Sequence, residues 1–273
     1  DAIFETGFMQ KHSVSFSGGT DRGNYYLSGS YMANDGIIVG DKDNHKRYTL
    51  TINAEQKIKP WLTIGTTNNL DEYTISEVST NNLYGGVTTS ALWLDPLTAV
   101  SYAPGNLTTF MQNLVNGGNV MLTDENGNYY GVSPFVQSEN YNPFILRDNH
   151  YTQRGGFRVN GSVYGNFTPI KNFTFTSRFG YRLYATRYTN VNLPFYGNGT
   201  KYSDIIDSVT GTETNTMYYQ WENFINYSKT IANKHNFTAM VGMSIQENSY
   251  DSVSGTLTGS GEDALQKNDE LFY

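Results

Sequence analysis

The chain has 273 residues, a formal net charge of −7 and no cysteine, which excludes disulfide scaffolds, thiolate metal sites and cysteine nucleophiles. Charged residues make up 16% of the sequence and aromatic residues 15%. Because a soluble domain usually carries about 25% charged residues, this balance favours a protein with one face in lipid. The basic residues form no stripe, so we expect no nucleic-acid partner.

Eight segments alternate between apolar and polar side chains with the two-residue period of a β-strand. In residues 47–55, for example, Tyr48, Leu50, Ile52 and Ala54 share one face. The predicted strands are residues 12–17, 24–33, 47–55, 62–70, 157–167, 173–183, 219–227 and 236–246. A tilted strand needs about ten residues to cross a bilayer, and most of these segments are close to that length.

The connections between the predicted strands alternate in length. The short ones are residues 18–23, 56–61, 168–172 and 228–235, and the long ones are 34–46, 71–156, 184–218 and the tail from 247. Outer-membrane barrels have this asymmetry, with tight periplasmic turns and long external loops. The sequence therefore predicts an all-β fold, an antiparallel transmembrane β-barrel segment of about eight strands, with residues 71–156 as its largest extracellular loop.

Aromatic residues stand at the ends of several predicted strands, among them Trp61, Phe173 and Tyr227. They predict a girdle at the membrane interface, where amphipathic rings are enriched. The alternative is core packing in a soluble β protein.

The long loop is the predicted functional region, since loops of this length are uncommon unless functional or disordered. Its aromatic residues are Tyr84, Trp93, Tyr102, Phe110, Tyr129, Tyr130, Phe135, Tyr141 and Phe144. Among them, Trp93, Tyr102, Tyr129 and Tyr130 are candidate substrate-binding residues, because aromatic faces stack on sugar rings. The alternative is that these residues pack the loop into a fixed shell or contact a lid protein.

Two local features of the loop carry structural expectations. Residues 108–116 are the one segment with a helical period. Residues 124–128 space their oxygen-bearing side chains somewhat like a calcium loop, but Asn126 followed by Gly127 favours a tight turn, with Tyr129 and Tyr130 in a small hairpin.

On the predicted register, Arg158, Arg178 and Arg182 point to the polar side of the sheet. Arg178 and Arg182 are candidate substrate-binding residues along a solvent-filled passage. The alternative is that these arginines pair with Glu55 and Glu222 across the interior.

Signals for chemistry are weak. The four histidines stand singly, with no second ligand three or four residues away, so we expect no metal site and no cofactor. No serine has a nearby histidine and carboxylate in the sequence, so we propose no catalytic residue and no enzyme activity.

Short motifs follow one another along nearly the whole chain: SFSGG at 15–19, NYYLSGSY at 24–31, DGII at 35–38, KPWLTIG at 59–65, DPL at 95–97, NPF at 142–144 and HNFTAMVG at 235–242. In this order they resemble the barrel of SusC/RagA-type TonB-dependent outer-membrane transporters, from the point where the barrel follows the plug domain. The resemblance implies a barrel of about 22 strands, of which this chain would supply about eight.

The resemblance also implies a function and partners. Such proteins are active importers of glycans or oligopeptides in the cell outer membrane, where they contact lipid. A SusD-like surface lipoprotein covers the barrel, and the TonB complex supplies energy. The chain begins at Asp1 and shows no TonB box, plug domain or closing C-terminal strand, so we expect it to be a central piece of the barrel.

Two other hypotheses remain open from the sequence. The eight strands can form a self-contained small barrel with a structural or adhesive role, which requires the first strand to pair with the eighth. They can also form a soluble β-sandwich that binds carbohydrate, which requires a second layer over the apolar face.

Overall fold

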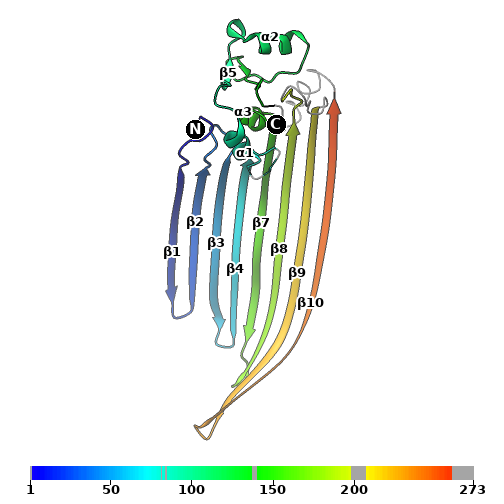
Figure 1. Ribbon diagram of the computed structural model, residues 1–273. Helices are drawn as coiled ribbons and strands as arrows, with labels where there is room; N and C mark the ends of the chain where they lie inside the picture. Colours follow the sequence, from blue (N-terminus) through cyan, green and yellow to red (C-terminus); the bar gives the residue numbers. More distant parts are fainter. Residues whose placement is uncertain (1, 81, 84, 137–139, 198–206, 260–273) are drawn as a thin grey trace.

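In a computed structural model, the chain forms one antiparallel sheet of eight strands, arranged side by side in chain order (Figure 1). The structure describes residues 2–80, 82–83, 85–136, 140–197 and 207–259. The strands of the sheet are β1 (Met9–Thr20), β2 (Gly23–Asp35), β3 (Asn44–Lys59), β4 (Leu62–Glu77), β7 (His150–Phe167), β8 (Phe173–Asn192), β9 (Asp207–Ile231) and β10 (His235–Gly259). In this described part, β1 and β10 lie at opposite edges, so the sheet is open and the strand pairing required for a self-contained barrel is not formed.

The other elements lie between β4 and β7. They are α1 (Val87–Trp93), β5 (Ser101–Tyr102), the 3-10 helix η1 (Pro104–Asn106), α2 (Thr109–Asn116), β6 (Tyr129–Tyr130) and α3 (Pro143–Asp148). Figure 1 shows them gathered beyond one end of the strands. We call this the loop end, and the opposite end, where short turns join the strands, the turn end. No helix among the described residues has the length and apolar character needed to span a membrane.

All eight predicted strands are confirmed, and every one is longer than predicted. Residues 71–77 belong to β4 and residues 150–156 to β7, so the largest connection is 78–149 rather than 71–156. Much of the predicted loop 184–218 and of the tail from 247 is likewise strand, while residues 198–206 and 260–273 lie outside the described residues.

The added strand lengths have mostly polar side chains and therefore no continuous apolar alternation. In β9 and β10, Thr210 pairs with Thr256, Thr212 with Ser254 and Thr214 with Ser252, through hydroxyl hydrogen bonds of 2.8–3.1 Å. Threonine suits a strand because its β-branched side chain fits the pleated surface, and cross-strand hydroxyl pairs add stability. A search for apolar alternation does not detect such a segment.

The sheet has one apolar face and one polar face. The register places Phe179 beside Val163 and Trp221, whereas Arg178 pairs with Tyr164 and Glu222 on the other face. The apolar face is uncovered, and its exposed side chains include Phe175 (36%), Phe179 (45%), Val241 (71%) and Met243 (62%). A soluble sandwich would bury these side chains under a second layer, so the described structure excludes that arrangement.

An aromatic band crosses the apolar face near the turn end. Trp61 stacks on Phe167 at 6.2 Å between ring centroids, and Phe167 contacts Phe175 at 6.0 Å. Further along the sheet, Tyr227 contacts Phe173 at 4.6 Å and Phe237 at 6.2 Å. The three aromatic residues predicted at strand ends thus belong to one band, which runs from the β3–β4 turn to β7, β8, β9 and β10.

One polar side chain on the apolar face has a local partner. Asn68, Gly161 and Tyr181 lie in one row across β4, β7 and β8. The hydroxyl of Tyr181 donates to Oδ1 of Asn68, and the Asn68 amide donates to the hydroxyl of Thr66 at 2.8 Å. The Tyr181 ring crosses over Gly161, where a side chain would overlap both partners.

Gly161→Ala is therefore expected to destabilise the sheet. The added methyl group displaces Tyr181 and leaves the Asn68 carbonyl without its donor on an apolar surface, at a cost of about 1–3 kcal/mol. Gly29→Ala is the matched control, because Gly29 also lies on the apolar face and has nothing within 4 Å of the added atom. Chemical unfolding in detergent measures both variants, and equal stabilities would contradict this role of Gly161.

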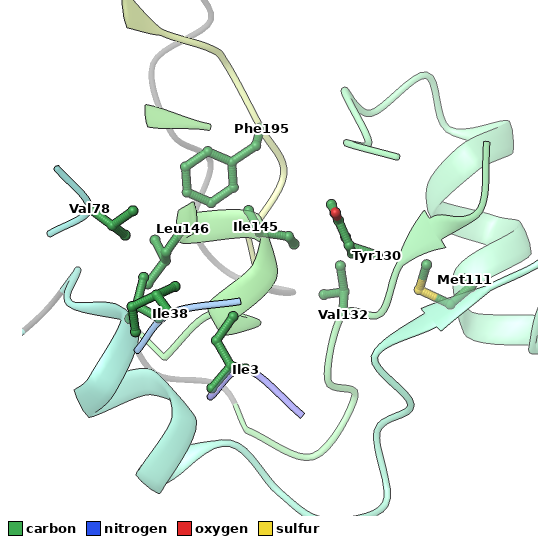
Figure 2. Close-up of a cluster of buried hydrophobic side chains, with 10 residues drawn as sticks. Ile3, Ile38, Val78, Met111, Tyr130, Val132, Ile145, Leu146 and Phe195 are labelled. Carbon is green, nitrogen blue, oxygen red and sulfur yellow. The ribbon is translucent and has the colours of Figure 1, made fainter. Parts of the chain in front are cut away.

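The hydrophobic core lies at the loop end, beyond the sheet, rather than against either of its faces. Figure 2 shows the cluster, in which Ile3, Ile38 of the β2–β3 connection and Phe195 of the β8–β9 connection meet residues of the long loop. The loop contributes Val78, Val87, Met111, Tyr130, Val132, Ile145 and Leu146. This core fixes the long loop on top of the strands.

Only some of the helices in the long loop can be predicted from the sequence. The predicted helix 108–116 is confirmed as α2, with the Thr108 hydroxyl accepting from the Met111 amide at 3.2 Å. The predictions missed α1 and α3, which have seven and six residues. Two turns are too short to establish an apolar period, although Asn142 before Pro143 is a start signal for α3.

Candidate functional site

The six candidate residues fall into two regions of the fold. Trp93, Tyr102, Tyr129 and Tyr130 belong to elements of the long loop, whereas Arg178 and Arg182 lie on the polar face of β8. Tyr84, another aromatic residue of this loop, lies outside the described residues.

The four aromatic residues of the loop have different surroundings. Trp93 ends α1 and is 52% exposed. Tyr102 and Tyr129 pair directly in the β5–β6 register, and both are partly buried against the hydrophobic cluster. Tyr130 is 2% exposed and is one of the largest fully buried side chains, so its ring packs the loop and offers no face to a ligand.

Tyr130 also takes part in a charged cluster, which we call the loop anchor: Lys42, Tyr130, Arg147 and Asp148. Arg147 donates to both oxygens of Asp148 at 2.8 Å, the Tyr130 hydroxyl donates to Oδ2 of Asp148, and Nζ of Lys42 lies 3.3 Å from Oδ1. Arg147 also donates to the Val39 carbonyl at 2.9 Å. The anchor therefore ties the long loop to the β2–β3 connection.

The surroundings of the loop anchor shift the pKa values of Asp148 and Tyr130. Burial works against the charged form of Asp148, but hydrogen bonds from Arg147 and Tyr130 and the nearby cations outweigh it and hold the pKa of Asp148 below 3.8. Burial, together with the hydrogen bond to Asp148, raises the pKa of the Tyr130 phenol. The anchor is thus an ionised carboxylate held by neutral and cationic donors.

The loop anchor is therefore expected to remain formed, with Asp148 ionised, at neutral and mildly acidic pH. A carboxyl group with a lowered folded-state pKa contributes stability above its ordinary value, here 3.8, and that contribution is lost as the pH falls through the folded-state pKa. Hydrogen exchange of residues 78–149 should stay slow at about pH 5 after correction for intrinsic rates, and should rise only below the ordinary carboxyl pKa. Loosening between about pH 5 and 7 would contradict this assignment.

Two motifs of the family resemblance, DPL and NPF, make hydrogen bonds that stabilise the long loop. Asp95 of the DPL motif accepts from the amides of Leu97 and Thr98, both at 2.9 Å, and from the Ser133 hydroxyl at 2.5 Å. Asn142 of the NPF motif donates to the carbonyls of Val100 and Gly131 at 2.9 and 3.0 Å. Both motifs join parts of the loop that are distant in sequence.

The predicted turn at 124–128 is confirmed. The Asp124 carboxylate accepts from the amides of Asn126 and Asn128 at 2.9 Å, and Gly127 has a φ of 76°, which favours glycine. The isolated bridge between Thr123 and Tyr129 closes a small hairpin. Within the described ranges, no three histidine, aspartate or glutamate residues come together as a metal site.

On the polar face, Arg178 has acidic and aromatic neighbours. Its Nη1 lies 3.9 Å from Oε2 of Glu222, and its guanidinium lies over the Tyr164 ring at 5.9 Å. Glu55 accepts instead from the Tyr164 hydroxyl at 2.8 Å, so Tyr164, and no arginine, is its partner. The predictions did not include Tyr164, because β4 and β7 are separated by the long loop and no short turn sets their register.

Arg182 and Arg158 form a different arrangement, which we call the Arg–Tyr stack: Tyr73, Arg158, Tyr184, Arg182 and Tyr218. Arg158 lies over Tyr73 at 4.4 Å and over Tyr184 at 5.6 Å. Arg182 lies over Tyr184 at 5.8 Å and over Tyr218 at 5.7 Å. Guanidinium groups and rings thus alternate across four strands, with Tyr184 shared by both arginines.

Comparisons of sequence give distant relatives of one kind. No family model matches the chain. The TonB-dependent receptor P3 of Formosa agariphila is 25% identical over 252 residues, which cover 90% of this chain and 22% of the relative. The TonB-dependent receptor P39 of the same organism is 24% identical over 256 residues, covering 90% of this chain and 20% of the relative. The chain thus spans about a fifth of these curated relatives.

Comparisons of structure give the same fold. The RagAB peptide transporter matches 97% of this chain with a TM-score of 0.69 and 21% identity, and the match covers 27% of the RagAB chain. The RagAB peptide importer in its open-open state matches with a TM-score of 0.68 and 19% identity. The chain is therefore similar in sequence to TonB-dependent receptors and has the fold of a segment of the SusC/RagA-type barrel, as its motifs predict.

Proposed function

We propose that this chain is part of an outer-membrane TonB-dependent active importer of glycans or oligopeptides. The observation that carries the proposal is the open eight-stranded sheet, with its uncovered apolar face and its arginine-bearing polar face. In this proposal the apolar face contacts lipid acyl chains and the polar face borders the passage. The aromatic band lies at the periplasmic interface, and residues 78–149 form the largest extracellular loop.

The comparisons support the role in transport, whereas the substrate class of this chain is part of the proposal. RagAB is described as a peptide importer, and the curated relatives are named TonB-dependent receptors. The proposed partners are a SusD-like lipoprotein at the loop end and the TonB complex, which acts through parts of the transporter other than this chain. The proposed protein moves its substrate and performs no covalent chemistry on it.

Two surfaces of the chain are proposed to contact substrate. At the loop end, Trp93 is exposed, and Tyr102 and Tyr129 each keep part of their ring accessible. Along the passage, the exposed guanidinium groups of Arg178 and Arg182 line the polar face. Tyr130 remains with the core of the loop.

Uptake by cells with and without the gene for the full-length protein tests the proposal. Wild-type cells are expected to deplete a defined mixture of oligopeptides and oligosaccharides, whereas deletion of the gene or of TonB abolishes depletion of the same members. A complementing copy should restore uptake. Equal depletion of every member by wild-type and deletion cells would overturn the importer function.

A further inference from the structure

We propose that the Arg–Tyr stack is an anion site that holds carboxylate groups of the imported substrate. The inference rests on the proposed import function and narrows it to substrates that carry acidic groups. The supporting observation is the distribution of charges on the polar face. Its acidic side chains are already engaged, whereas Arg158 and Arg182 have no carboxylate within ion-pair distance in the described part of the chain.

Each acidic residue near the stack has another partner. Asp71 binds Arg47 at 2.9 Å, and Glu77 lies 3.4 Å from Arg154. Although Asp71 is opposite Arg158 in the strand register, Arg158 instead donates to the Tyr73 hydroxyl at 3.1 Å. Two cations that the sheet leaves without a counter-ion produce a local positive potential, and a bound anion is the species that this potential stabilises.

The geometry of the stack favours a planar anion. Each guanidinium carbon lies 4.4–5.8 Å from the centroids of two tyrosine rings. Among the described residues, the Tyr73 hydroxyl is the one hydrogen-bond acceptor of either group, so each group keeps a planar N–H edge for a ligand. This edge binds a carboxylate through two parallel hydrogen bonds. Arg182 is exposed and Arg158 is half-buried, so both are reached from the polar side.

The stack is also held in place before any ligand arrives. The Tyr184 hydroxyl donates to Oδ1 of Asn160 at 3.2 Å, and the Tyr218 hydroxyl donates to Oε1 of Gln220 at 2.7 Å. Long arginine side chains normally lose rotamer entropy when they bind, and stacking between fixed rings removes part of that cost. The site is therefore pre-organised by its own neighbours.

The position of the stack fits a site on a transport path. Arg158 lies near the middle of β7 and Arg182 near the middle of β8. A solute that moves along the polar face from the loop end to the turn end passes this level. A carboxylate on such a solute comes from an acidic oligopeptide or from a uronic-acid oligosaccharide, and both present the same planar anion to the two arginines.

Uptake of matched probes by cells with the full-length transporter tests the site and separates the two sources. One pair contains oligopeptides of equal length with glutamate or glutamine, and the other contains oligosaccharides with uronic acids or the corresponding neutral sugars. Wild-type cells are expected to import the acidic member of at least one pair about tenfold faster than its neutral partner, as expected for charge-assisted hydrogen bonds. The responding pair identifies the source of the carboxylate.

The double variant Arg158→Gln/Arg182→Gln should bring that ratio close to one, because it lowers the uptake of acidic probes far more than the uptake of neutral ones. Arg158→Lys/Arg182→Lys should recover only part of the preference, because lysine keeps the charge and loses the planar edge. Arg187→Gln is the control, since Arg187 lies on the opposite face of β8 beside Glu213.

The other possible results separate failure of the anion site from failure of the import function. An equal loss of acidic and neutral uptake in the double variant would assign the arginines to support of the barrel or its interior and overturn the anion site. Uptake by wild-type cells without any preference for acidic probes would overturn it as well, while leaving the import function intact. Absence of uptake of all four probes, together with depletion of no other oligomer, would overturn the import function and this site together.

Discussion

Val241→Arg is expected to destabilise the barrel folded in a bilayer by about 2–4 kcal/mol, which is the cost of a lipid-facing arginine near the membrane midplane. Val241 lies in the middle of the apolar stretch of β10, between Phe237 and Ile245, and its side chain is 71% exposed on the uncovered face. An arginine there must either lose its hydration in hydrocarbon or draw water and headgroups into the membrane. Folding titrations of the full-length barrel into lipid vesicles measure this loss.

The neighbouring residue supplies a matched control. Met240 is 72% exposed, but the alternation of the strand turns it to the polar face beside Asn226. Met240→Arg therefore places the same charge one residue away in contact with water, and its folding free energy should stay near that of the wild type. Equal destabilisation by both substitutions would contradict the assignment of the two faces, and with it the membrane orientation on which the proposed function depends.

This pair of residues also shows what the sequence alone determines. Alternation in segments such as 236–246 reveals which residues share a face, because a strand has only two faces. The short turns then fix the pairing of each hairpin, so the face of every strand follows from neighbouring residues. For this reason the strands, the turn end and the apolar face were predictable without a structure.

The long loop and the polar-face contacts were less predictable. Arg158 and Tyr73 come together only when β4 and β7 pair, and the 72 residues of 78–149 separate these strands in the sequence. Tyr130 illustrates the other difficulty: an aromatic residue in a loop is equally compatible with binding and with packing. Its burial in one hydrophobic cluster with Met111, Val132 and Ile145 depends on contacts that no local pattern encodes.

The loop anchor leads to the second large expected effect, the loosening of residues 78–149 by Asp148→Ala. The substitution removes the carboxylate that joins Lys42, Tyr130 and Arg147. The Arg147 guanidinium, with 18% of its side chain exposed, is left without a counter-ion in a largely desolvated place. Breaking a buried charge pair from one side typically costs about 3–5 kcal/mol, and the partial exposure here reduces the expected loss to about 2–3 kcal/mol.

Hydrogen exchange of the full-length protein measures this loss as faster opening of 78–149 and of the connection between β2 and β3, because Arg147 donates to the Val39 carbonyl. The strands of the sheet should keep their protection, since their hydrogen bonds do not involve the anchor. Tyr130→Phe keeps the buried ring and removes the two hydrogen bonds of the hydroxyl, one donated to Asp148 and one accepted from Arg147 at 3.2 Å. Its effect should therefore be about 1–2 kcal/mol, smaller than that of Asp148→Ala. If both variants leave exchange in the loop unchanged, the hydrophobic cluster alone holds the loop. If Asp148→Ala unfolds the sheet as well, the loop and the barrel form one cooperative unit, and the loop then helps to fix the position of the strands that carry the arginines.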